Sequence, residues 1–495
     1  FDPTPGQPGD FAVAPSNRIL DVLQSLGGFI PSIGDPFNRQ LAITPGRTYE
    51  GETTDWGASL QIDYDFGGAT LTSITAYRDY INYFPSDTDY TNVDILRRND
   101  DDNAFREFRT FTQELRLQGT AFDDRLDWLL GLYYFTEDGE NLNPVDFRPV
   151  SLQSGGYFDY ESRAVFAQAT YRATDKLSIT PGVRYTEDER NYLPDQYFEE
   201  LPVGPLGFPC FDPSFHIPCV VGDRVVPYQT VESSAEEFTP YFNVAYEWTT
   251  GVMTYASYSE GFKSGGYTQR IFPPEASLPS FAPEYVKSYE VGFKLAPGRN
   301  MHLNGAVFYT DYTDLQLLVA DASRIGPFIT NAGSAEIKGF ELEWAYAFGE
   351  GWRLDAGAGY TDPEYKELRN DVQGLTVDSD FVLISEWNVS ASVERRIALA
   401  SAGDITPRLD WSWRSKFQTN ASGVPDPRLV QPDYSVLNAS VNWRSASEHL
   451  AVTAGVDNAT DERYRTFGDF QPGFGFYMEA FDRGRQWYVK LMAQY

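Results

Sequence analysis

Hydrophobic and polar residues alternate with a period of two in several segments of the chain. In the last segment, RQWYVKLMAQY, every second residue from Trp487 to Tyr495 is apolar, and the residues between them form a more polar set. The segments KLSITPGVRYT (176–186) and WRLDAGAGY (352–360) repeat this pattern. Because successive side chains of a strand point to opposite faces, each segment predicts a β-strand with one apolar face. About ten residues is also the length of a tilted strand that crosses a membrane.

Aromatic residues stand at the ends of these predicted strands. Trp352 and Tyr360 bound one of them, and Trp487 and Tyr495 bound another. Membrane barrels place such residues in girdles at the two membrane–water interfaces. A soluble sandwich also alternates, but it gives no reason for this placement, so the pattern favours strands that cross a membrane.

Two kinds of connection separate the predicted strands. Short turns are predicted at 66–69, 121–125, 173–176, 248–251, 296–300, 348–351, 398–404 and 445–449. Much longer connections are predicted near 81–108, 138–158, 190–234, 263–283, 313–331, 362–381, 416–433 and 465–480. Outer-membrane barrels alternate short periplasmic turns with long extracellular loops, whereas a propeller or a jelly roll has no such rule. We therefore predict an all-β fold, a transmembrane antiparallel β-barrel.

The pattern contains eight hairpins and a final strand, hence about seventeen strands. Single-chain bacterial barrels have an even number of strands and both termini in the periplasm. We therefore expect residues 51–495 to form the C-terminal part of a barrel and residues 1–50 to be the remainder of an extracellular loop. Within that loop, SNRILDVLQSLGG predicts a short helix with Ser16 as its cap and Gly27 as its stop. Its apolar stripe would be Ile19, Val22, Leu23 and Leu26.

Composition supports this picture. The chain has 495 residues and a formal net charge of −32. Its mean hydropathy is −0.41, and it lacks the run of roughly 18 apolar residues that a spanning helix needs. Low mean hydropathy is also expected of a barrel, since lipid-facing and lumen-facing residues alternate. The 71 acidic residues would repel phosphates, so we expect no nucleic-acid partner.

An ordered set of segments resembles the C-terminal barrel of TonB-dependent outer-membrane receptors, from about residue 50 to the C-terminus. Each segment alone is weak, but their order along the chain is specific. The segments are ATLTSITAYRDY (69–80), FTQELRLQG (111–119), LDWLLGLYYFTED (126–138), LSITPGVRYTEDER (177–190), YASYSEGFKSGGY (255–267), EYVKSYEVGFK (284–294), NAGSAEIKGFELEW (331–344) and VDNATDERYR (456–465).

The resemblance implies a barrel of about 22 strands filled by an N-terminal plug. The strands here would be the last seventeen, because the plug, the short TonB-contacting segment and about five strands have no counterpart in this sequence. It further implies active import of a scarce nutrient across the outer membrane, with a ferric siderophore as the commonest substrate. The ligand would be a transported ferric chelate, and no permanently bound cofactor is expected. The expected partners are outer-membrane lipid, lipopolysaccharide, the missing plug and strands, and the TonB protein through the plug.

Two alternatives to import remain at this point. One is a passive pore or a structural barrel subunit of an envelope assembly. The other is an outer-membrane hydrolase, but His216, His302 and His449 fall in a long connection, a strand and a short turn. They are not expected to meet, and no Ser/His/Asp or zinc constellation is apparent, so we predict no enzyme.

Cys210 and Cys219 lie nine residues apart in the connection 190–234. In an oxidising envelope this spacing predicts a disulfide that restricts the loop. A metal or redox site is the alternative, but further ligands are lacking nearby.

The stretch GFKSGGYTQR (261–270) is the strongest candidate for ligand contact. Phe262 and Tyr267 could stack on a ligand, while Lys263 and Arg270 could meet anionic groups. The competing interpretation is a polar stretch that lines the lumen and packs on a plug. Tyr312 and Phe470 would add aromatic surface from neighbouring loops.

An acidic tract occupies the first long connection. Its members are Asp87, Asp89, Asp94, Asp100, Asp101 and Asp102. Carboxylates suit a divalent cation such as calcium, although the tract lacks the ordered spacing of an EF-hand. The alternative is a solvated acidic loop, and the sequence leaves a metal site here undetermined.

Overall fold

The computed structural model describes residues 23, 25–28, 42–89, 91–98, 106–147, 150–201, 219–269, 271–272, 274–319, 328–369, 374–420, 425–471 and 476–494. Strands dominate the described residues, and they confirm the predicted all-β fold. Within these ranges, no helix is long and apolar enough to cross a membrane.

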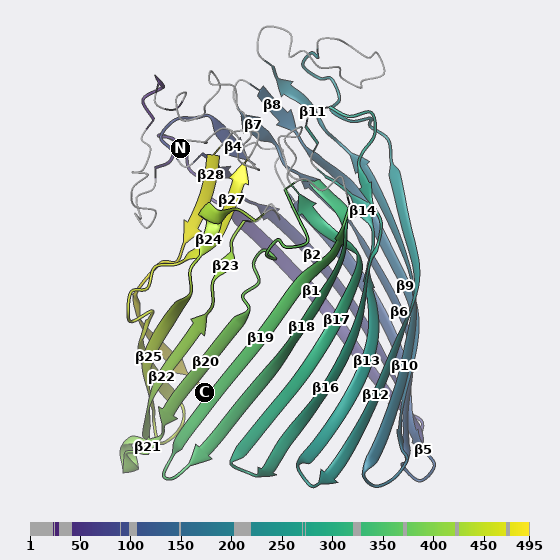
Figure 1. Ribbon diagram of the computed structural model, residues 1–495, viewed down its shortest axis with the longest axis vertical. Coiled ribbons are helices and arrows are strands. Elements are labelled where there is room, and N and C mark those ends of the chain that lie inside the picture. The colour runs from purple at the N-terminus through teal and green to yellow at the C-terminus, as the bar shows by residue number, and fades with distance from the viewer. Residues whose placement is uncertain are drawn as a thin grey trace.

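One antiparallel sheet of eighteen strands forms the wall of the molecule (Figure 1). Its strands are β1 (Glu52–Asp65), β2 (Ala69–Tyr83), β5 (Arg106–Ala121), β6 (Leu126–Leu142), β9 (Gly155–Arg172), β10 (Leu177–Pro194), β12 (Val231–Thr249), β13 (Val252–Lys263), β16 (Glu284–Gly298), β17 (Met301–Val319), β18 (Phe328–Phe348), β19 (Trp352–Leu368), β20 (Trp387–Arg395), β21 (Ile397–Ala398), β22 (Asp404–Arg414), β25 (Tyr434–Arg444), β26 (Leu450–Asp457) and β29 (Gln486–Ala493). Because β21 continues β20 along the same neighbour, β22, the wall corresponds to the seventeen strands expected.

Each wall strand pairs with the next one along the chain, so the sheet is a continuous meander. The sheet curls so that β1 and β2 pass behind β18 and β19 in the view of Figure 1. Among the described residues, β1 pairs with β2 alone and β29 with β26 alone.

The strand ends confirm all eight short turns, which lie together at one end of the wall (Figure 1). At the other end the strands run further than the alternation predicted. The connection expected at 313–331 is partly strand, because β17 extends to Val319 and β18 begins at Phe328. The register of β17 shifts between Tyr312 and Leu315, and Asp314 there has a φ of 53°. Such a bulge breaks the period of two, which explains why the sequence pattern ended early.

The two faces of the wall differ in chemistry. One register row joins Leu303, Trp344, Ala356, Ala391 and Trp411 across five strands. The next row on the opposite face contains Asn304, Glu343, Gly357, Ser390 and Ser412. The apolar face is exposed, with Val307 at 57 % and Val489 at 74 %. A continuous exposed apolar face of this extent fits lipid contact, so the polar face lines the lumen.

The long connections form a cap of small sheets above the wall (Figure 1). A five-stranded sheet has the order β11-β8-β7-β4-β3. The cap strands are β3 (Ser86–Asp87), β4 (Leu96–Arg98), β7 (Val145–Phe147), β8 (Val150–Gln153), β11 (Tyr197–Glu200), β14 (Gly266–Tyr267), β15 (Ser280–Phe281), β23 (Phe417–Gln418), β24 (Val430–Gln431), β27 (Arg465–Gln471) and β28 (Phe476–Phe481). Two short 3-10 helices, Ala400–Ala402 and Pro427–Leu429, complete the described elements. Several fully buried apolar residues, such as Phe198 and Val225, lie in this cap.

The helix predicted near the N-terminus falls mostly outside the described residues, including its predicted cap Ser16 and the stripe residues Ile19 and Val22. What is described fits a helix end at the predicted stop. Gly27 has a φ of 78°, and the N–H of Gly28 donates to the carbonyl of Leu23 at 2.7 Å, as in a glycine-terminated helix. Leu23 is buried but Leu26 is exposed.

Candidate functional site

A pocket of about 350 Å³ opens on the lumen side at the cap end of the wall. The residues that line it come from β9, β10, β14, β15, β17 and β18 and the adjoining loop, and span positions 160 to 329. They are Tyr160, Arg190, Tyr192, Gly266, Tyr267, Thr268, Gln269, Phe281, Leu318, Phe328 and Ile329. Aromatic rings therefore form much of its wall, with one cation among them.

Arg190 supplies that cation. It lies opposite Tyr160 in the register of β9 and β10, on the face that continues the polar set of β10. Its guanidinium carbon lies 5.4 Å from the centre of the Tyr160 ring, which is cation–π geometry. An Arg190 guanidinium N–H also donates to the Gly265 carbonyl at 3.4 Å. Within the described ranges Arg190 makes no ion pair, so its charge is available to an anionic ligand.

Tyr192 and Tyr267 stand beside Arg190 in the pocket lining. Tyr192 is almost fully buried, and its hydroxyl has no hydrogen-bond partner among the described residues. The Tyr267 hydroxyl donates to the carbonyl of Glu232. Burial, with a smaller effect of Glu232, raises the pKa of Tyr267 above its usual range, so this phenol stays a neutral donor.

The connection 263–283 turns inward to form one side of the pocket. The Ser264 hydroxyl donates to Asp188 on the lumen face of β10. The Gln316 side-chain amide donates to the carbonyls of Ser264 at 3.1 Å and Ala282 at 3.0 Å. The Asn331 side chain donates to the Ala282 carbonyl and accepts from the Ala282 N–H. These buried amides satisfy backbone groups that would otherwise lack partners, and they fix the path of the connection.

The ligand residues expected in this stretch separate in the structure. Phe262 and Lys263 are consecutive in β13 and therefore lie on opposite faces. Phe262 is in register with Tyr285 on the outer face, whereas Lys263 is on the lumen face. Tyr267 lines the pocket, and Arg270 lies outside the described residues.

The two more distant candidates also fall in different places. Tyr312 packs against the buried cluster of Leu315, Val319, Ala332, Ala335, Tyr365 and Leu375. Phe328 contacts the same cluster and lines the pocket, whereas Tyr312 is not among the residues that line it. Phe470 stacks on Tyr477 at 4.6 Å, beneath the guanidinium of Arg428, and does not line this pocket.

Sequence reasoning missed Arg190, Tyr160 and Tyr192. A signal for two of them existed in the segment LSITPGVRYTEDER and the residues after it. Its polar face contains Arg184, and continuing the period of two places Arg190 and Tyr192 on the same face. Tyr160 gave no such signal, because its role depends on the pairing of β9 with β10.

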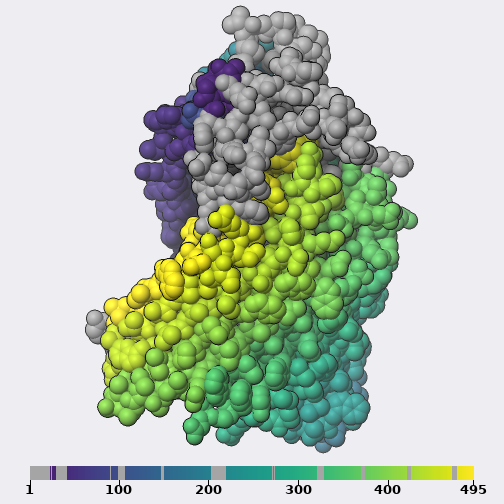
Figure 2. Space-filling model, turned by 60° about the vertical axis from the view of Figure 1, so that its left-hand side comes forward, coloured from purple at the N-terminus to yellow at the C-terminus, as the bar shows by residue number. Residues whose placement is uncertain are grey.

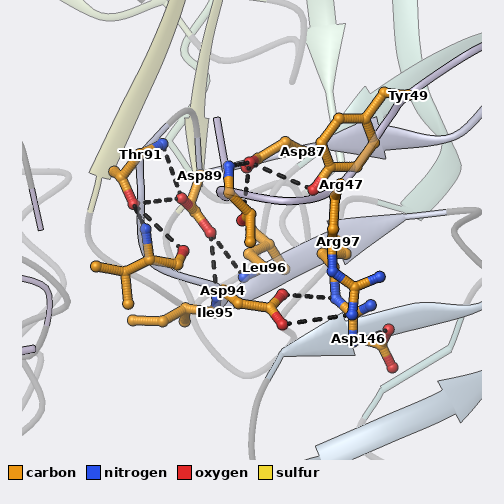
Figure 3. A network of polar contacts seen from close by, with 12 residues as sticks. Arg47, Tyr49, Asp87, Asp89, Thr91, Asp94, Ile95, Leu96, Arg97 and Asp146 are labelled. Carbon is orange, nitrogen blue, oxygen red and sulfur yellow. Dashed lines mark hydrogen bonds and ion pairs between the residues drawn. The ribbon is translucent and has the colours of Figure 1, made fainter. Parts of the chain in front are cut away.

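Carboxylates of the acidic tract bind protein donors (Figure 3). Asp87 accepts hydrogen bonds from the Thr44 N–H at 2.8 Å and from the Tyr49 hydroxyl at 3.4 Å. Asp89 accepts from the N–H and hydroxyl of Thr91 and from the Leu96 N–H at 2.8 Å. These two side chains therefore order the turn between β3 and β4.

Asp94 is neutralised by arginine (Figure 3). Arg97 bridges Asp94 at 2.8 Å and Asp146 at 3.1 Å, and Arg47 lies 3.6 Å from Asp94. The described half of the tract is thus a structural network, and Asp100, Asp101 and Asp102 lie outside the described residues. Among the described residues, no group of three or more His, Cys, Asp and Glu side chains could hold a metal ion.

The cysteines and histidines that the sequence analysis considered lie in different parts of the protein or outside the described residues. Cys219 is disulfide-bonded, and Cys210 lies outside the described residues, so their pairing stays a prediction. His302 lines a lumen hollow with Asp355 and Asp410, and His449 contacts the Gln494 carbonyl at 3.0 Å in a short turn. His216 lies outside the described residues.

Comparison with known proteins identifies the protein family to which the chain belongs. The model of the family described as TonB dependent receptor-like, beta-barrel, matches residues 4–459. The pesticin receptor of Yersinia enterocolitica is 27 % identical over 439 residues, which cover 88 % of this chain and 56 % of that protein. The ferric-pyoverdine 358 receptor of Pseudomonas putida is 26 % identical over 252 residues, or 49 % of this chain and 28 % of that protein. The chain spans about half the length of the pesticin receptor.

Solved structures share the fold. The ferric yersiniabactin uptake receptor of Yersinia pestis superposes with a TM-score of 0.71 at 21 % identity, covering 90 % of this chain and 61 % of that one. The ferric-catecholate import receptor of Escherichia coli K12 gives a TM-score of 0.64 at 13 % identity, covering 89 % and 64 %. At these identities the likeness concerns the fold.

Proposed function

Because the chain belongs to the TonB dependent receptor-like β-barrel family, we propose that it is the barrel part of a receptor that imports a ferric siderophore. The barrel lies in the bacterial outer membrane, with its short turns in the periplasm and its cap outside the cell. Import through such a receptor is active and depends on the TonB protein, which acts through a plug domain. No bond is made or broken in the protein, so the function is transport and not catalysis.

The observation that carries this proposal is the lumenal pocket around Arg190. It opens at the cap end, where a ligand arriving from outside first meets the wall. Aromatic rings from Tyr160, Tyr192 and Tyr267 line it, and Arg190 supplies a positive charge that is paired with no carboxylate among the described residues. Aromatic faces and a guanidinium suit a chelate that combines flat rings with negative charge.

The names of similar proteins support the same class of ligand. They include a ferric-pyoverdine receptor, a ferrichrome transporter and a ferric yersiniabactin uptake receptor. These names describe ferric chelates of different chemistry, so they favour a ferric siderophore as a class. The aromatic lining favours a phenolate or catecholate chelate within that class. Tyr267 and Arg190 would contact it directly, and Lys263 would add positive charge on the lumen face.

Uptake of labelled iron tests the proposal. The full-length protein is expressed in a bacterium that lacks its own ferric-siderophore receptors, and radioactive iron is supplied as a ferric catecholate, phenolate, hydroxamate or citrate. We expect accumulation of one aromatic chelate, abolished by a proton ionophore and in a strain without TonB. Accumulation that persists in both conditions would instead indicate the alternative, a passive pore. Purified protein would then also conduct ions across a planar bilayer.

A further inference from the structure

A groove of about 960 Å³ crosses the outer, lipid-facing surface of β20, β22, β25, β26 and β29. Figure 2 shows the outer surface of these C-terminal strands in green to yellow. Trp352 and Trp487 stand among the lining residues at opposite sides of this run of strands, and most residues between them are small or apolar. Glu394 and Arg408 also line the groove, and they pair with each other at 2.9 Å. Its volume is near the upper end of the roughly 300–1,000 Å³ of small-molecule sites.

The register explains why the surface is hollow there. One outer row pairs Val393, Leu409, Ala439, Val456 and Trp487. In the neighbouring row, Pro407, Val441, Ala454 and Val489 are paired. The small side chains of Ala439 and Ala454 lie between bulkier neighbours, so the middle of the face is recessed.

Arg395 lies at one end of the groove. It is in register with Trp352, and its guanidinium carbon lies 5.2 Å from the centre of the Trp352 ring. Among the described residues it has no ion pair or hydrogen bond, and its Nε atom is buried without a partner. Neighbouring arginines differ: Arg396 pairs with Asp404 at 2.8 Å, and Arg408 pairs with Glu394 at 2.9 Å. An arginine on a lipid-facing surface that has no anionic partner among the described residues needs an anion from elsewhere.

The position of Arg395 identifies the source of that anion. Trp352 is the first residue of β19, directly after a short turn. Rings of Trp344, Tyr346, Phe348 and Trp352 stack in succession at this end of the wall. Such an aromatic girdle marks the membrane–water interface. Because the short turns are periplasmic, Arg395 lies at the depth of the phosphates of the periplasmic leaflet, and the groove leads from there over the apolar face.

We propose that this groove binds a glycerophospholipid of the periplasmic leaflet. The headgroup phosphate contacts the Arg395 guanidinium, and one acyl chain lies in the recess over Ala439 and Ala454. Charge complementarity selects the phosphate, and the apolar recess selects the chain. Lipopolysaccharide is excluded as the occupant because it resides in the opposite leaflet, next to the cap. This lipid site depends on the membrane orientation of the barrel and not on the ligand that the receptor imports.

Native mass spectrometry of the full-length protein in mild detergent tests this, with phosphatidylglycerol as the added probe. We expect the protein to retain one lipid, and Arg395→Gln to weaken retention roughly tenfold, as for the loss of a charge-assisted hydrogen bond. Ala454→Phe, which fills the recess and keeps the charge, should weaken it similarly. Arg396→Gln is the matched control, since it removes an equal charge from the next residue, and should leave retention unchanged.

Two results would overturn the proposal. Equal retention by Arg395→Gln and the unaltered protein would mean that the lipid is not held by this guanidinium. An equal loss in Arg396→Gln would mean that the charge acts without a defined site. Ala439→Leu fills the same recess from another strand, so the proposal can still be tested if Ala454→Phe fails to fold. Heat-modifiable migration in gels confirms that each variant keeps its barrel.

Discussion

Arg190 lies directly across from Tyr160 on the lumen face, with its guanidinium carbon 5.4 Å from the centre of the tyrosine ring. The ring holds the guanidinium without neutralising it, because cation–π contact leaves the positive charge in place. A carboxylate in the same position would have formed an internal ion pair. This pair therefore presents a fixed positive charge beside aromatic surface, which is the feature on which the proposed ligand chemistry rests.

Replacing Arg190 should weaken binding of an anionic ferric chelate. We expect Arg190→Gln to raise the dissociation constant roughly tenfold or more, the usual effect of losing one charge-assisted contact. Fluorescence quenching by the ferric chelate measures it on the full-length protein. Arg184→Gln is the matched control, because Arg184 lies on the same face of β10 and contacts the rings of Tyr133 and Phe166 outside the pocket. Equal losses in both variants would contradict a specific role of Arg190.

The inward path of the connection 263–283 should depend on Gln316. Its side chain donates to the carbonyls of Ser264 and Ala282. Gln316→Met leaves the Ser264 carbonyl without this donor, at about 1–3 kcal/mol for an unsatisfied group, whereas the Ala282 carbonyl keeps the donor from Asn331. We expect faster protease cleavage between residues 264 and 283 and weaker ligand binding. Gln113→Met on the outer face of β5, whose side-chain amide donates to the Ser73 hydroxyl far from this connection, should leave cleavage of this connection unchanged.

The wall was predictable because its signals are local. The alternation of apolar and polar residues in RQWYVKLMAQY, and the turn residues between strands, are patterns that extend over only a few positions. The sequence alone therefore indicates the two faces of each strand, the turns and the number of strands. The bulge at Asp314 is the kind of detail it could not indicate, since a positive φ at a non-glycine residue depends on what the surrounding ladder imposes.

The pocket was predictable only in part. Tyr267, which lines the pocket, was a candidate because aromatic and glycine residues cluster around it in the sequence. Lys263, predicted as a cation next to them, lies on the lumen face but not in the pocket lining. The pairing of Tyr160 with Arg190 and the bracing by Gln316 join residues far apart in sequence. Likewise, the sequence left open a cation site in the acidic tract, and only the structure shows that Arg97 and Arg47 neutralise Asp94. Such relationships depend on long-range packing, which no local pattern encodes.

The acidic tract should make the turn between β3 and β4 sensitive to pH. Burial raises the pKa of Asp89, with Asp87 adding to the shift and hydrogen bonds from Thr91 and Leu96 opposing it. The folded turn thus holds the Asp89 proton more tightly than the unfolded chain. This contribution to stability is full below about pH 3.9, the ordinary value, and is lost as pH rises through the raised pKa.

Hydrogen exchange measures this effect in residues 86–98, after correction for the intrinsic pH dependence of exchange. Relative to Asp89→Asn, which does not titrate, the unaltered turn should lose protection between pH 4 and pH 7, a range chosen to span roughly the titration of a carboxyl with a raised pKa. Parallel pH profiles for the two proteins would show that Asp89 does not titrate differently in the folded state.

Cys219 should be joined to Cys210. Cys219 is disulfide-bonded, and the chain contains two cysteines. Digestion without reducing agent should yield one peptide pair linked between these positions, which separates on reduction. A mass that shows Cys219 linked to anything else would contradict the pairing. If the bridge shapes the loop for ligand contact, Cys210→Ser combined with Cys219→Ser should weaken ligand binding while the barrel stays folded.

Replacing Tyr267 should weaken ligand binding far more than replacing Phe262, although both residues are aromatic and only five positions apart. Tyr267 lines the pocket and anchors its hydroxyl on the Glu232 carbonyl, whereas Phe262 lies on the outer face of β13 in register with Tyr285. We expect Tyr267→Ala to weaken binding of an aromatic ferric chelate roughly tenfold, because a stacked ring and its burial are lost. Phe262→Ala should leave the dissociation constant unchanged within about twofold. If the two substitutions weaken binding equally, the ligand does not occupy this pocket, because only one of these side chains reaches it.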